Sequence, residues 1–431
     1  MTKVVIVGAV GGGATVASQI RRYDKECTID IFEKNGYVAF SNCGMPYVVG
    51  GVVEDREEII PDPEDFSKKY DVRLHLHHEV IDIQRDSKAV IVKNNTTTFE
   101  IPYDTLILSP GGHAVLPDIP GSTLPHCFRL RTIEQMDHIL QYIKENTPIS
   151  AVIVGGGAIG VEMAEALQLL QIETTIIERN KHVMSRLDPF ISEGLAKDLE
   201  SKGISIITED EVIEVTEDNQ VATKHNGNLQ ADMVLFSIGI QPNTDLAKKA
   251  NLTIGETSGI KVNNVGLTSD PSIYALGDAV EVIHTVTNQP FRVPLAWPAH
   301  RQAFVIANNI AGNNIAYSGS QATNIVKGFD YVVASTGATS SQLKEANIHF
   351  GRIEHESKQH AGYYPGAHPI RIVVFFDKAT MKILGAQVGG TTGVDKRIDV
   401  LSAFILLGGT VDQLAQLEIA YAPPSLLQKI H

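Results

Sequence analysis

The sequence predicts an α/β protein made of two similar, doubly wound units followed by a smaller α+β domain. An apolar run followed by a glycine-rich turn occurs at residues 4–13 and again at 151–160. Each turn precedes a segment of helical composition and a second apolar run that ends in a glutamate, Glu33 or Glu178. From about residue 321 the pattern changes to alternating, strand-like segments and one segment of helical periodicity.

Composition limits the classes of function. The 431 residues are 43% hydrophobic and 20% charged, which is typical of a soluble globular protein of two or three domains. A formal charge of -14 argues against nucleic-acid and anionic-membrane partners. No apolar run approaches the roughly 18 to 20 residues of a membrane span, and residues 1–8 lack a signal-peptide pattern. We therefore expect a cytoplasmic protein.

The first glycine-rich turn has the pattern of a dinucleotide site. It lies between a strand at 4–7 and a helix at 14–22, and its glycines are Gly8, Gly11, Gly12 and Gly13. The N-terminus of such a helix offers unpaired N–H groups to a pyrophosphate, and Glu33 can accept hydrogen bonds from a ribose hydroxyl. Val10 occupies the middle glycine position of the G-x-G-x-x-G fingerprint, so Gly11 and Gly12 are expected to let the backbone approach instead. A packing role alone for the glycines is the alternative.

The second turn carries the complete fingerprint, with Gly155, Gly157 and Gly160. Glu178 stands where it would bind the ribose 2′-hydroxyl of NADH, and Arg179 beside it suits the 2′-phosphate of NADPH. The coenzyme preference stays open. Two fingerprints about 145 residues apart predict two Rossmann-like dinucleotide-binding domains, one for FAD and one for NADH or NADPH.

Three further apolar strands end in glycine turns. They run over 105–112, 233–243 and 273–279, and they add Ser109, Gly111, Gly239, Gly277 and Asp278 to the candidate cofactor-binding residues. The carboxyl ends of parallel strands are the edge at which open sheets bind ligands. For Asp278, helix N-capping is the alternative.

Cys43, in the segment 41–47, is the candidate redox residue. It precedes a proline-initiated helix, and a helix N-terminus lowers the pKa of a thiol from about 8.5. A small buried cysteine is the alternative. Cys27 and Cys127 are read as structural, and their spacing supports neither a disulfide nor a metal site. The histidines His75, His77 and His78 are expected on a solvated strand face.

The last part of the chain predicts the α+β domain. Strands are expected at 324–336 and 370–376, a helix at 395–407, and an irregular tail containing Tyr421. We expect the first domain at 1–115, the second at 116–254, a return to the first at 255–320, and the C-terminal domain at 321–431.

Together these motifs resemble the FAD- and pyridine-nucleotide-dependent disulfide oxidoreductases, and within them the single-cysteine coenzyme A disulfide reductases. The similarity covers nearly the whole chain. Its carriers are the segments 8–15, 18–22, 41–47, 155–160, 277–278, 294–297, 363–366, 395–400 and 420–424.

The resemblance implies an FAD domain, an NAD(P)H domain and a C-terminal dimerisation domain, in a homodimer whose active sites are shared between subunits. Glu33 and Asp278 are expected to hold FAD, and Tyr363 and Tyr421 to reach the cysteine of the partner subunit as catalytic residues. Lys34, Asn42 and Pro294 are further cofactor candidates, and Glu162 faces the nicotinamide or simply suits the helix dipole. The implied coenzyme A channel is lined by Thr15, Gln19, Arg22 and Asn42.

The expected reaction passes electrons from NAD(P)H through FAD to a mixed disulfide between Cys43 and coenzyme A. No second cysteine follows in a Cys-x-x-x-x-Cys arrangement, so a bound small thiol is the natural substitute.

Several other functions stay open. A persulfide, polysulfide or thiosulfinate reductase would use the same thiolate chemistry, although relatives specialised for persulfides often add a rhodanese-like domain that is not found up to His431. An NADH peroxidase or oxidase would cycle Cys43 through sulfenic acid, but such relatives carry a histidine at the position of Gly11. A non-catalytic flavin redox sensor is disfavoured by the complete second fingerprint.

Overall fold

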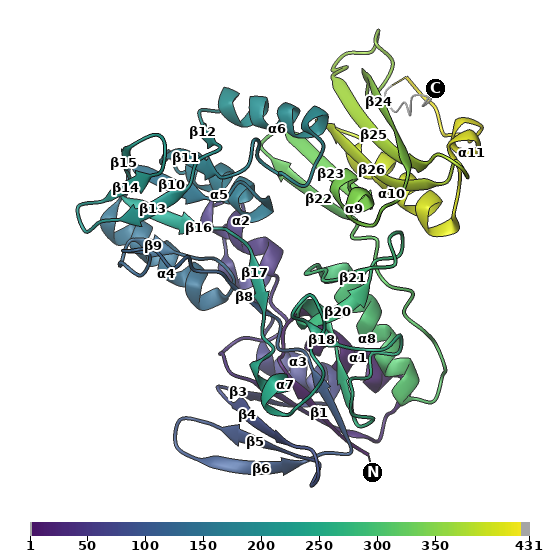
Figure 1. Cartoon of the computed structure of the whole chain (residues 1–431). Helices are drawn as coiled ribbons and strands as arrows, with labels where there is room; N and C mark the ends of the chain where they lie inside the picture. Colours follow the sequence, from purple (N-terminus) through teal and green to yellow (C-terminus); the bar gives the residue numbers. More distant parts are fainter. Residues whose placement is uncertain (1, 424–431) are drawn as a thin grey trace.

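Three bodies make up the protein, and the computed structural model describes residues 2–423 (Figure 1). The first nucleotide unit lies at the bottom of the view, the second at the upper left, and the C-terminal domain at the upper right.

The first nucleotide unit is built on a parallel five-stranded sheet of order β19-β7-β1-β2-β3. Its strands are β1 (Lys3–Val7), β2 (Thr28–Glu33), β3 (Arg73–Leu76), β7 (Thr105–Leu108) and β19 (Ile273–Ala275). Val4, Val5 and Ile6 are fully buried, as expected for a parallel strand covered on both faces.

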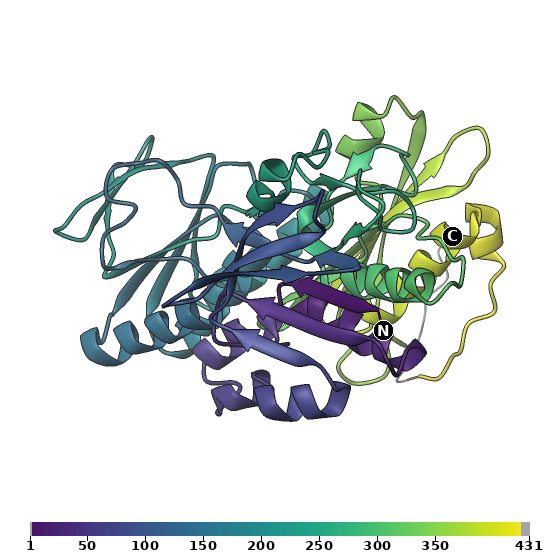
Figure 2. The same cartoon turned by 90° about the horizontal axis from the view of Figure 1, so that it is seen from below.

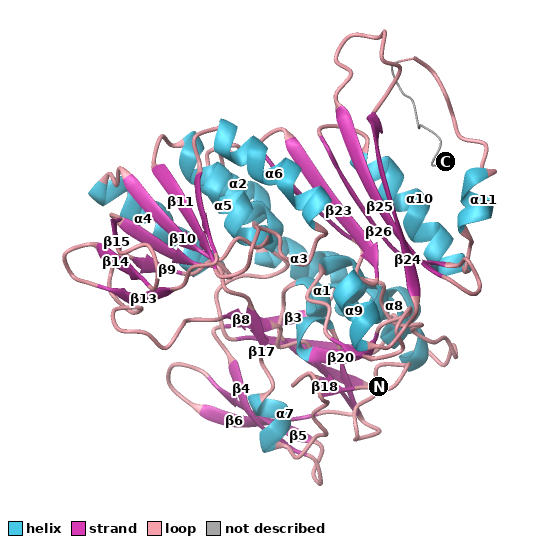
Figure 3. Cartoon of the chain, turned by 45° about the horizontal axis from the view of Figure 1, so that its top comes forward, coloured by secondary structure: helices cyan, strands magenta, loops and turns pink. Residues whose placement is uncertain are grey.

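Different layers cover the two faces of this sheet. Helices α1 (Gly11–Tyr23) and α8 (Ala296–Ile310) pack side by side and share a core with Val4 and Ile6 (Figure 3). The antiparallel strands β4 (Glu79–Gln84), β5 (Ala89–Lys93) and β6 (Thr98–Pro102) supply the layer next to Val5 and Val7, in view from below in Figure 2. Shorter elements complete the unit: η2 (Arg56–Ile59), α3 (Pro63–Tyr70), β18 (Ile260–Lys261), β20 (Val280–Ile283) and β21 (Pro290–Phe291).

The second nucleotide unit repeats the plan with a parallel sheet of order β12-β11-β10-β16-β9. Its strands are β9 (Cys127–Phe128), β10 (Ser150–Val154), β11 (Glu173–Glu178), β12 (Ser205–Thr208) and β16 (Met233–Phe236). Its helices are α4 (Ile133–Asn146), α5 (Ala158–Leu169) and α6 (Pro189–Ser201), and a small antiparallel sheet holds β13 (Val212–Val215), β14 (Gln220–Thr223) and β15 (Asn228–Gln230).

Two paired strands join the nucleotide units. β8 (Gly112–Ala114) leaves the first unit, β17 (Ile240–Pro242) returns to it, and the two are antiparallel neighbours. The next helix, α7 (Asp245–Lys249), already packs against β4 of the first unit. We therefore propose to place the end of the second domain at about residue 243 rather than at 254.

The C-terminal domain is an antiparallel sheet of order β22-β23-β26-β25-β24 with helices beside it. Its elements are β22 (Asn324–Gly328), β23 (Tyr331–Gly337), α9 (Ser340–Glu345), β24 (Phe350–Lys358), β25 (Pro369–Asp377), β26 (Ile383–Gly390), α10 (Val394–Leu407) and α11 (Val411–Ala415). The expected strands and helix of this domain are present. The predicted fold class, two α/β nucleotide units and an α+β domain, is confirmed.

The second unit is fastened to the C-terminal sheet through α6. Asp188, the N-cap of α6, accepts two hydrogen bonds from the Arg352 guanidinium at 2.7 and 2.9 Å. Its backbone N–H donates to Gln387 Oε1 at 2.6 Å. A further ion pair joins Lys202 to Asp330 at 2.5 Å. These contacts join the second unit to the C-terminal domain.

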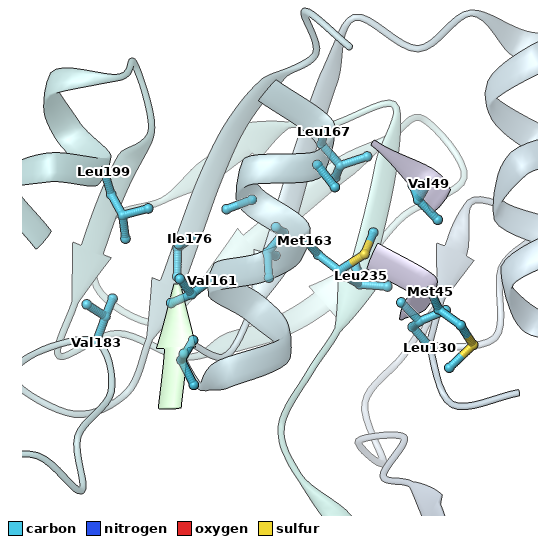
Figure 4. Close-up of a cluster of buried hydrophobic side chains, with 14 of the residues drawn as sticks. Met45, Val49, Leu130, Val161, Met163, Leu167, Ile176, Val183, Leu199 and Leu235 are labelled. Carbon is cyan, nitrogen blue, oxygen red and sulfur yellow. The ribbon is translucent and has the colours of Figure 1, made fainter. Parts of the chain in front are cut away.

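One of the apolar clusters contains residues from all three bodies. Figure 4 shows part of it, where Met45 and Val49 lie beside the helix that carries Met163 and Leu167. The same cluster contains Val326 and Phe375 of the C-terminal domain. Within residues 2–423, no helix combines the length and the apolarity required to cross a lipid bilayer.

Candidate active site

The first glycine turn contains one open position and several crowded ones. Gly8 has φ +93°, and a Cβ on it or on Gly13 would overlap a carbonyl oxygen, of Ser109 or of Gly8 respectively. A Cβ on Gly12 would lie 2.6 Å from Ser109 Oγ. Around Gly11, in contrast, no atom lies within 4 Å of that position. Of the two glycines expected to replace the missing fingerprint residue, Gly11 is the one that leaves room at the N-terminus of α1.

The second turn has the same division of roles. Gly155 has φ +105°, and a Cβ on Gly160 would overlap the Gly155 carbonyl oxygen. Gly157, the N-cap of α5, has no neighbour within 4 Å of a Cβ. Val10, at the equivalent position of the first turn, packs against the shared apolar core. Both turns therefore leave an open backbone cradle at a helix N-terminus, which fits a pyrophosphate.

Two buried glutamates occupy equivalent places in the two units. Glu33 accepts hydrogen bonds from the N–H groups of Ala9 and Asn35, each at 2.9 Å. Glu178 accepts from the N–H groups of Gly156 at 2.8 Å and Asn180 at 2.9 Å. Glu178 Oε1 also accepts from Asn180 Nδ2, but Glu178 Oε2 and both oxygens of Glu33 keep a free lone pair, so both groups can still accept a ribose hydroxyl. The residues present thus fit two dinucleotides.

The remaining cofactor candidates line the same edges of the two sheets. Gly111, Gly239 and Gly277 have positive φ angles of +65°, +119° and +81°, and the first two have open space where a Cβ would be. Ser109 lies between the Gly8 and Gly12 backbones. Lys34, Arg179 and Pro294 are exposed, and Arg179 forms no ion pair with any residue of 2–423.

Cys43 lies in the short helical turn η1 (Asn42–Gly44), directly before α2 (Met45–Val49). It is exposed, so the buried-cysteine alternative is excluded. The expectation of a lowered pKa is wrong: desolvation by the surrounding protein raises the pKa of the thiol, and the Glu162 carboxylate raises it further. The helix has only five residues, so its dipole is small beside these effects.

Arg131 is a site residue that the sequence analysis missed. Its guanidinium donates to the Asp278 carboxylate and lowers the pKa of the Cys43 thiol, while its carbonyl accepts from Asn42 Nδ2 at 3.0 Å. Asp278 sits inside η3 (Gly277–Ala279) and makes no capping hydrogen bond. Arg131 therefore links the cysteine segment to Asp278. In the sequence, Arg131 is marked only by its place before Thr132, the N-cap of α4. Because a capping threonine is common at helix starts, this place does not point to a functional role.

Glu162 and Tyr47 are the other ionisable neighbours of Cys43. Burial, together with the charge of Glu165, raises the pKa of Glu162 to about 7. The pKa of Tyr47 is also raised, by burial first and then by Glu162 and Glu165. The Glu162 carboxylate thus acts on Cys43 through its charge, although the sequence suggested only the nicotinamide or the helix dipole for it.

Three substrate candidates share one face of α1. Thr15, Gln19 and Arg22 are spaced by four and three residues, and the stripe starts next to the open position at Gly11. Thr15 Oγ1 donates to the Gly11 carbonyl at 2.6 Å. Arg22 is exposed and makes no ion pair within the described chain. The fourth candidate, Asn42, belongs to the cysteine segment.

Tyr363 and Tyr421 come together on the C-terminal domain. They are 77% and 60% exposed, and a side-chain hydrogen bond between them raises the pKa of Tyr363. The tail is held nearby, where the Ala361 N–H donates to the Pro423 carbonyl at 3.2 Å. The charged groups that shift the pKa of Cys43 in the same chain are Glu162, Arg131 and Asp278, and the tyrosines are not among them.

Two of the three histidines, His75 and His78, make side-chain contacts with the protein, whereas His77 is exposed. His75 stacks on Phe32 with ring centroids 4.6 Å apart, and its Nε2 lies 3.0 Å from the buried Asp30 carboxylate. The expected solvated strand face is therefore wrong for His75. Within residues 2–423, no three or more His, Cys, Asp or Glu side chains are grouped as metal ligands.

Comparison with known proteins identifies the family of the chain. Residues 2–303 match the family model described as pyridine nucleotide-disulphide oxidoreductase, and residues 323–428 match its dimerisation domain. The coenzyme A disulfide reductase of Staphylococcus haemolyticus is 40% identical over 428 residues, covering 98% of this chain and 96% of that protein.

Two solved structures are similar to this chain in both fold and sequence. Reduced Bacillus anthracis CoADR-RHD is 40% identical with a TM-score of 0.96, covering 98% of this chain and 77% of that one. An NAD-dependent persulfide reductase from A. fulgidus is 35% identical, also with a TM-score of 0.96, covering 98% and 80%. The predicted dependence on FAD and NAD(P)H and the oxidoreductase class are confirmed by these matches. The chain belongs to the pyridine nucleotide-disulphide oxidoreductase family.

Proposed function

We propose that the protein reduces coenzyme A disulfide, or a closely related small disulfide, through a mixed disulfide on Cys43. The observation that carries this proposal is a single exposed thiol at the site. Cys27 is 4% exposed and lies in the same core as Val4 and Ile6, and burial raises the pKa of Cys127 to about 11. No internal cysteine is therefore placed to resolve a mixed disulfide. The Staphylococcus haemolyticus relative is named for this activity.

NAD(P)H, when bound, would supply two electrons as a hydride, and FAD would carry these electrons to the disulfide. We propose that Gly11, Glu33, Ser109, Asp278 and the residues around them hold FAD, and that Gly157, Glu178 and Gly239 hold the coenzyme. The fit rests on the open cradles and the carboxylates described above. The remaining cofactor candidates, Gly8, Gly12, Gly13, Lys34, Asn42, Gly111, Gly155, Gly160, Glu162, Arg179, Gly277 and Pro294, would support these two sites.

The Cys43 thiolate attacks one sulfur of the disulfide. The substrate S–S bond breaks, one coenzyme A thiolate leaves, and a Cys43–coenzyme A disulfide forms. Two electrons and a proton then cleave that bond, which restores the Cys43 thiolate and releases the second thiol. Thr15, Gln19, Arg22 and Asn42 would bind the substrate, with the Arg22 guanidinium on a phosphate group.

The dimerisation domain supports a homodimer, and we propose that each active site takes Tyr363 and Tyr421 from the partner subunit. In this chain the two hydroxyls face each other at an exposed surface rather than Cys43. A tyrosine hydroxyl there would stabilise the thiolate or protonate a leaving thiolate.

The cysteines form no disulfide, which fits a reducing compartment such as the cytoplasm.

The deciding measurement is intact-protein mass under non-reducing conditions, before and after dithiothreitol. We expect wild type to carry an adduct of coenzyme A mass that reduction removes, and Cys43→Ser to carry none. An unmodified or oxygenated Cys43 in wild type would contradict the proposal.

Persulfide reduction is the second candidate, favoured by the structure from A. fulgidus. Thiolate attack on sulfur is the same for both substrates, so the ratio of kcat/KM for coenzyme A disulfide, a persulfide and a thiosulfinate decides between them. Rapid peroxide or oxygen turnover would instead support a sulfenic acid cycle. A redox sensor would bind FAD but oxidise negligible NAD(P)H with every disulfide.

A further inference from the structure

Two carboxylates on α5 lie one turn apart beside the cysteine segment. Glu162 and Glu165 are three residues apart, so they share a face of the helix. Helix α2, which follows Cys43, packs directly on α5: a Cβ on Gly50 would lie 2.9 Å from Ala166 Cα. Figure 4 shows the apolar side of this contact, with Val49 next to Leu167. The Cys43 segment and α5 are therefore held together by close backbone packing.

The two glutamates have different environments. Glu165 is tied to the C-terminal domain, because Lys327 Nζ lies 3.2 Å from Oε1 and the Phe329 N–H donates to Oε2 at 2.9 Å. Glu162 is half-buried and makes no hydrogen bond or ion pair with any residue of 2–423. Glu165 is thus held by the C-terminal domain. Glu162 has no such contact and affects Cys43 and Tyr47 through its charge.

We propose that Lys327, acting through Glu165, sets the charge of Glu162 and thereby the proton on Cys43. Lys327 and Glu165 are then positioning residues of the redox site, and Glu162 is the group that exchanges a proton with the thiol. In this exchange Cys43–SH and the Glu162 carboxylate become the Cys43 thiolate and the Glu162 carboxylic acid. The inference rests on the proposed role of Cys43 as the redox thiol.

The direction of each coupling follows from charge. The Glu162 carboxylate raises the pKa of Cys43, after the larger effect of burial, and Arg131 opposes it while Asp278 adds to it. Glu165 raises the pKa of Glu162, again after burial, to about 7. Glu162 therefore loses its proton near neutral pH, and in doing so it makes the thiolate less favourable. Two groups coupled in this way share one proton over the intervening pH range.

The test is the pH profile of Cys43 alkylation by iodoacetamide, from pH 5 to 10, on the reduced, flavin-loaded dimer. Modification of the Cys43 peptide is followed by mass spectrometry, so Cys27 and Cys127 do not interfere. Glu162→Gln removes the opposing charge, and we expect the midpoint to fall by about 0.5 to 1 pH unit. One step of the profile comes from the titration of Glu162. Glu165→Gln should shift this step to lower pH. Lys327→Met leaves the Glu165 charge uncompensated and should shift the step to higher pH.

Two control variants distinguish the proposed effect of Lys327 on Cys43, which we call the relay, from a general loss of structure. Lys327→Arg keeps the positive charge and should retain the wild-type profile. Lys202→Met removes the ion pair between Lys202 and Asp330. This ion pair also joins the second unit to the turn that contains Phe329, but it does not involve Glu165. It should leave the profile unchanged even if stability falls.

Unchanged profiles in both Glu165→Gln and Lys327→Met would overturn the relay, and an unchanged profile in Glu162→Gln would overturn the role of Glu162. If Lys327→Met does not fold, Glu165→Gln and Lys327→Arg still decide the question. The alkylation rate does not depend on which disulfide is the substrate, so failure here is distinct from failure of the proposed function.

Discussion

Gly157 and Gly160 illustrate how two glycines of one fingerprint serve different needs. A Cβ on Gly160 would overlap the Gly155 carbonyl oxygen, whereas a Cβ on Gly157 would enter open space at the start of α5. The first position is required by packing of the helix on the strand, and the second by the approach of a ligand. The two requirements can be separated by mutation.

We expect Gly157→Ala to fold normally but to bind NAD(P)H about tenfold more weakly or worse, because the methyl group would occupy the open space that the ligand approaches. A tenfold loss corresponds to ~1.4 kcal/mol. Gly160→Ala should lower the melting temperature or the yield, because the methyl group forces backbone to move. Thermal unfolding and coenzyme titration of both variants check this. Equal coenzyme affinity of Gly157→Ala and wild type would contradict the assignment of the open cradle.

At this scale the sequence was informative wherever a residue acts next to its own motif. The contacts of Glu33 and Glu178 lie within the same strand-turn-helix unit, so spacing alone predicted their place at the glycine turns. The pKa of Cys43 could not be predicted in that way, because Glu162 and Arg131 reach it only after the chain has folded. Arg131 lies 147 positions from Asp278 in the sequence.

At the scale of elements, the N-terminus of α6 is the main link between the second unit and the C-terminal sheet. Asp188 caps the helix and at the same time accepts hydrogen bonds from Nε and Nη2 of Arg352, while its own N–H donates to Gln387 Oε1. The carboxylate is buried, so loss of its partner would leave a charge with incomplete compensation.

We expect Arg352→Met to destabilise the protein by about 1.5 to 3 kcal/mol, the range for hydrogen bonds to charged groups. Urea unfolding at pH 7, followed by fluorescence and circular dichroism, measures this. Arg179→Met, which removes an exposed arginine without a salt bridge among residues 2–423, is the matched control and should change stability little. If Arg352→Met lowers the free energy of unfolding as little as Arg179→Met does, the stabilising role of the Asp188–Arg352 pair is contradicted.

The same pair gives a pH dependence with a defined sign. Burial raises the pKa of Asp188, but the hydrogen bonds and charge of Arg352 outweigh it, so the folded-state pKa is lowered. This stabilisation is present above the usual carboxyl pKa of about 3.9 and is lost as the pH falls through the lower, folded-state value. The difference between wild type and Arg352→Met should therefore persist at pH 5 and shrink only at strongly acidic pH.

Elements with a long periodic pattern could be predicted from the sequence, and short ones could not. The helix expected at 395–407 is α10 (Val394–Leu407), and the strand expected at 370–376 is β25 (Pro369–Asp377). In contrast, β8 and β17 have three residues each, too few for any periodicity, and their pairing depends on the placement of both nucleotide units.

At the scale of the whole molecule, the proposal that Tyr363 and Tyr421 serve the active site of a partner subunit can be tested. A mixed dimer tests this directly. One chain carries Cys43→Ser, and the other carries Tyr363→Phe with Tyr421→Phe; the two are co-expressed with different tags and purified through both.

If the site is shared, one of the two sites in this mixed dimer has its cysteine and both tyrosines intact, and we expect about half of the wild-type disulfide reductase activity. If each site is built within one chain, every site lacks either the thiol or the hydroxyls. The mixed dimer would then be no more active than the two parental variants. Flavin content of all three preparations is the control for folding.

The pairing of β8 with β17 has a consequence for engineering. Since Ala114 lies opposite Ile240, the chain enters and leaves the second nucleotide unit at adjacent points. The unit is therefore a natural cassette, and a chimaera that exchanges it for a homologous one needs only two neighbouring splice points. Such a graft would have to carry a partner for Arg352 at the start of its α6 and a carboxylate for Lys327 on its α5. Coenzyme preference could then be transferred as a block, without redesign of the flavin site.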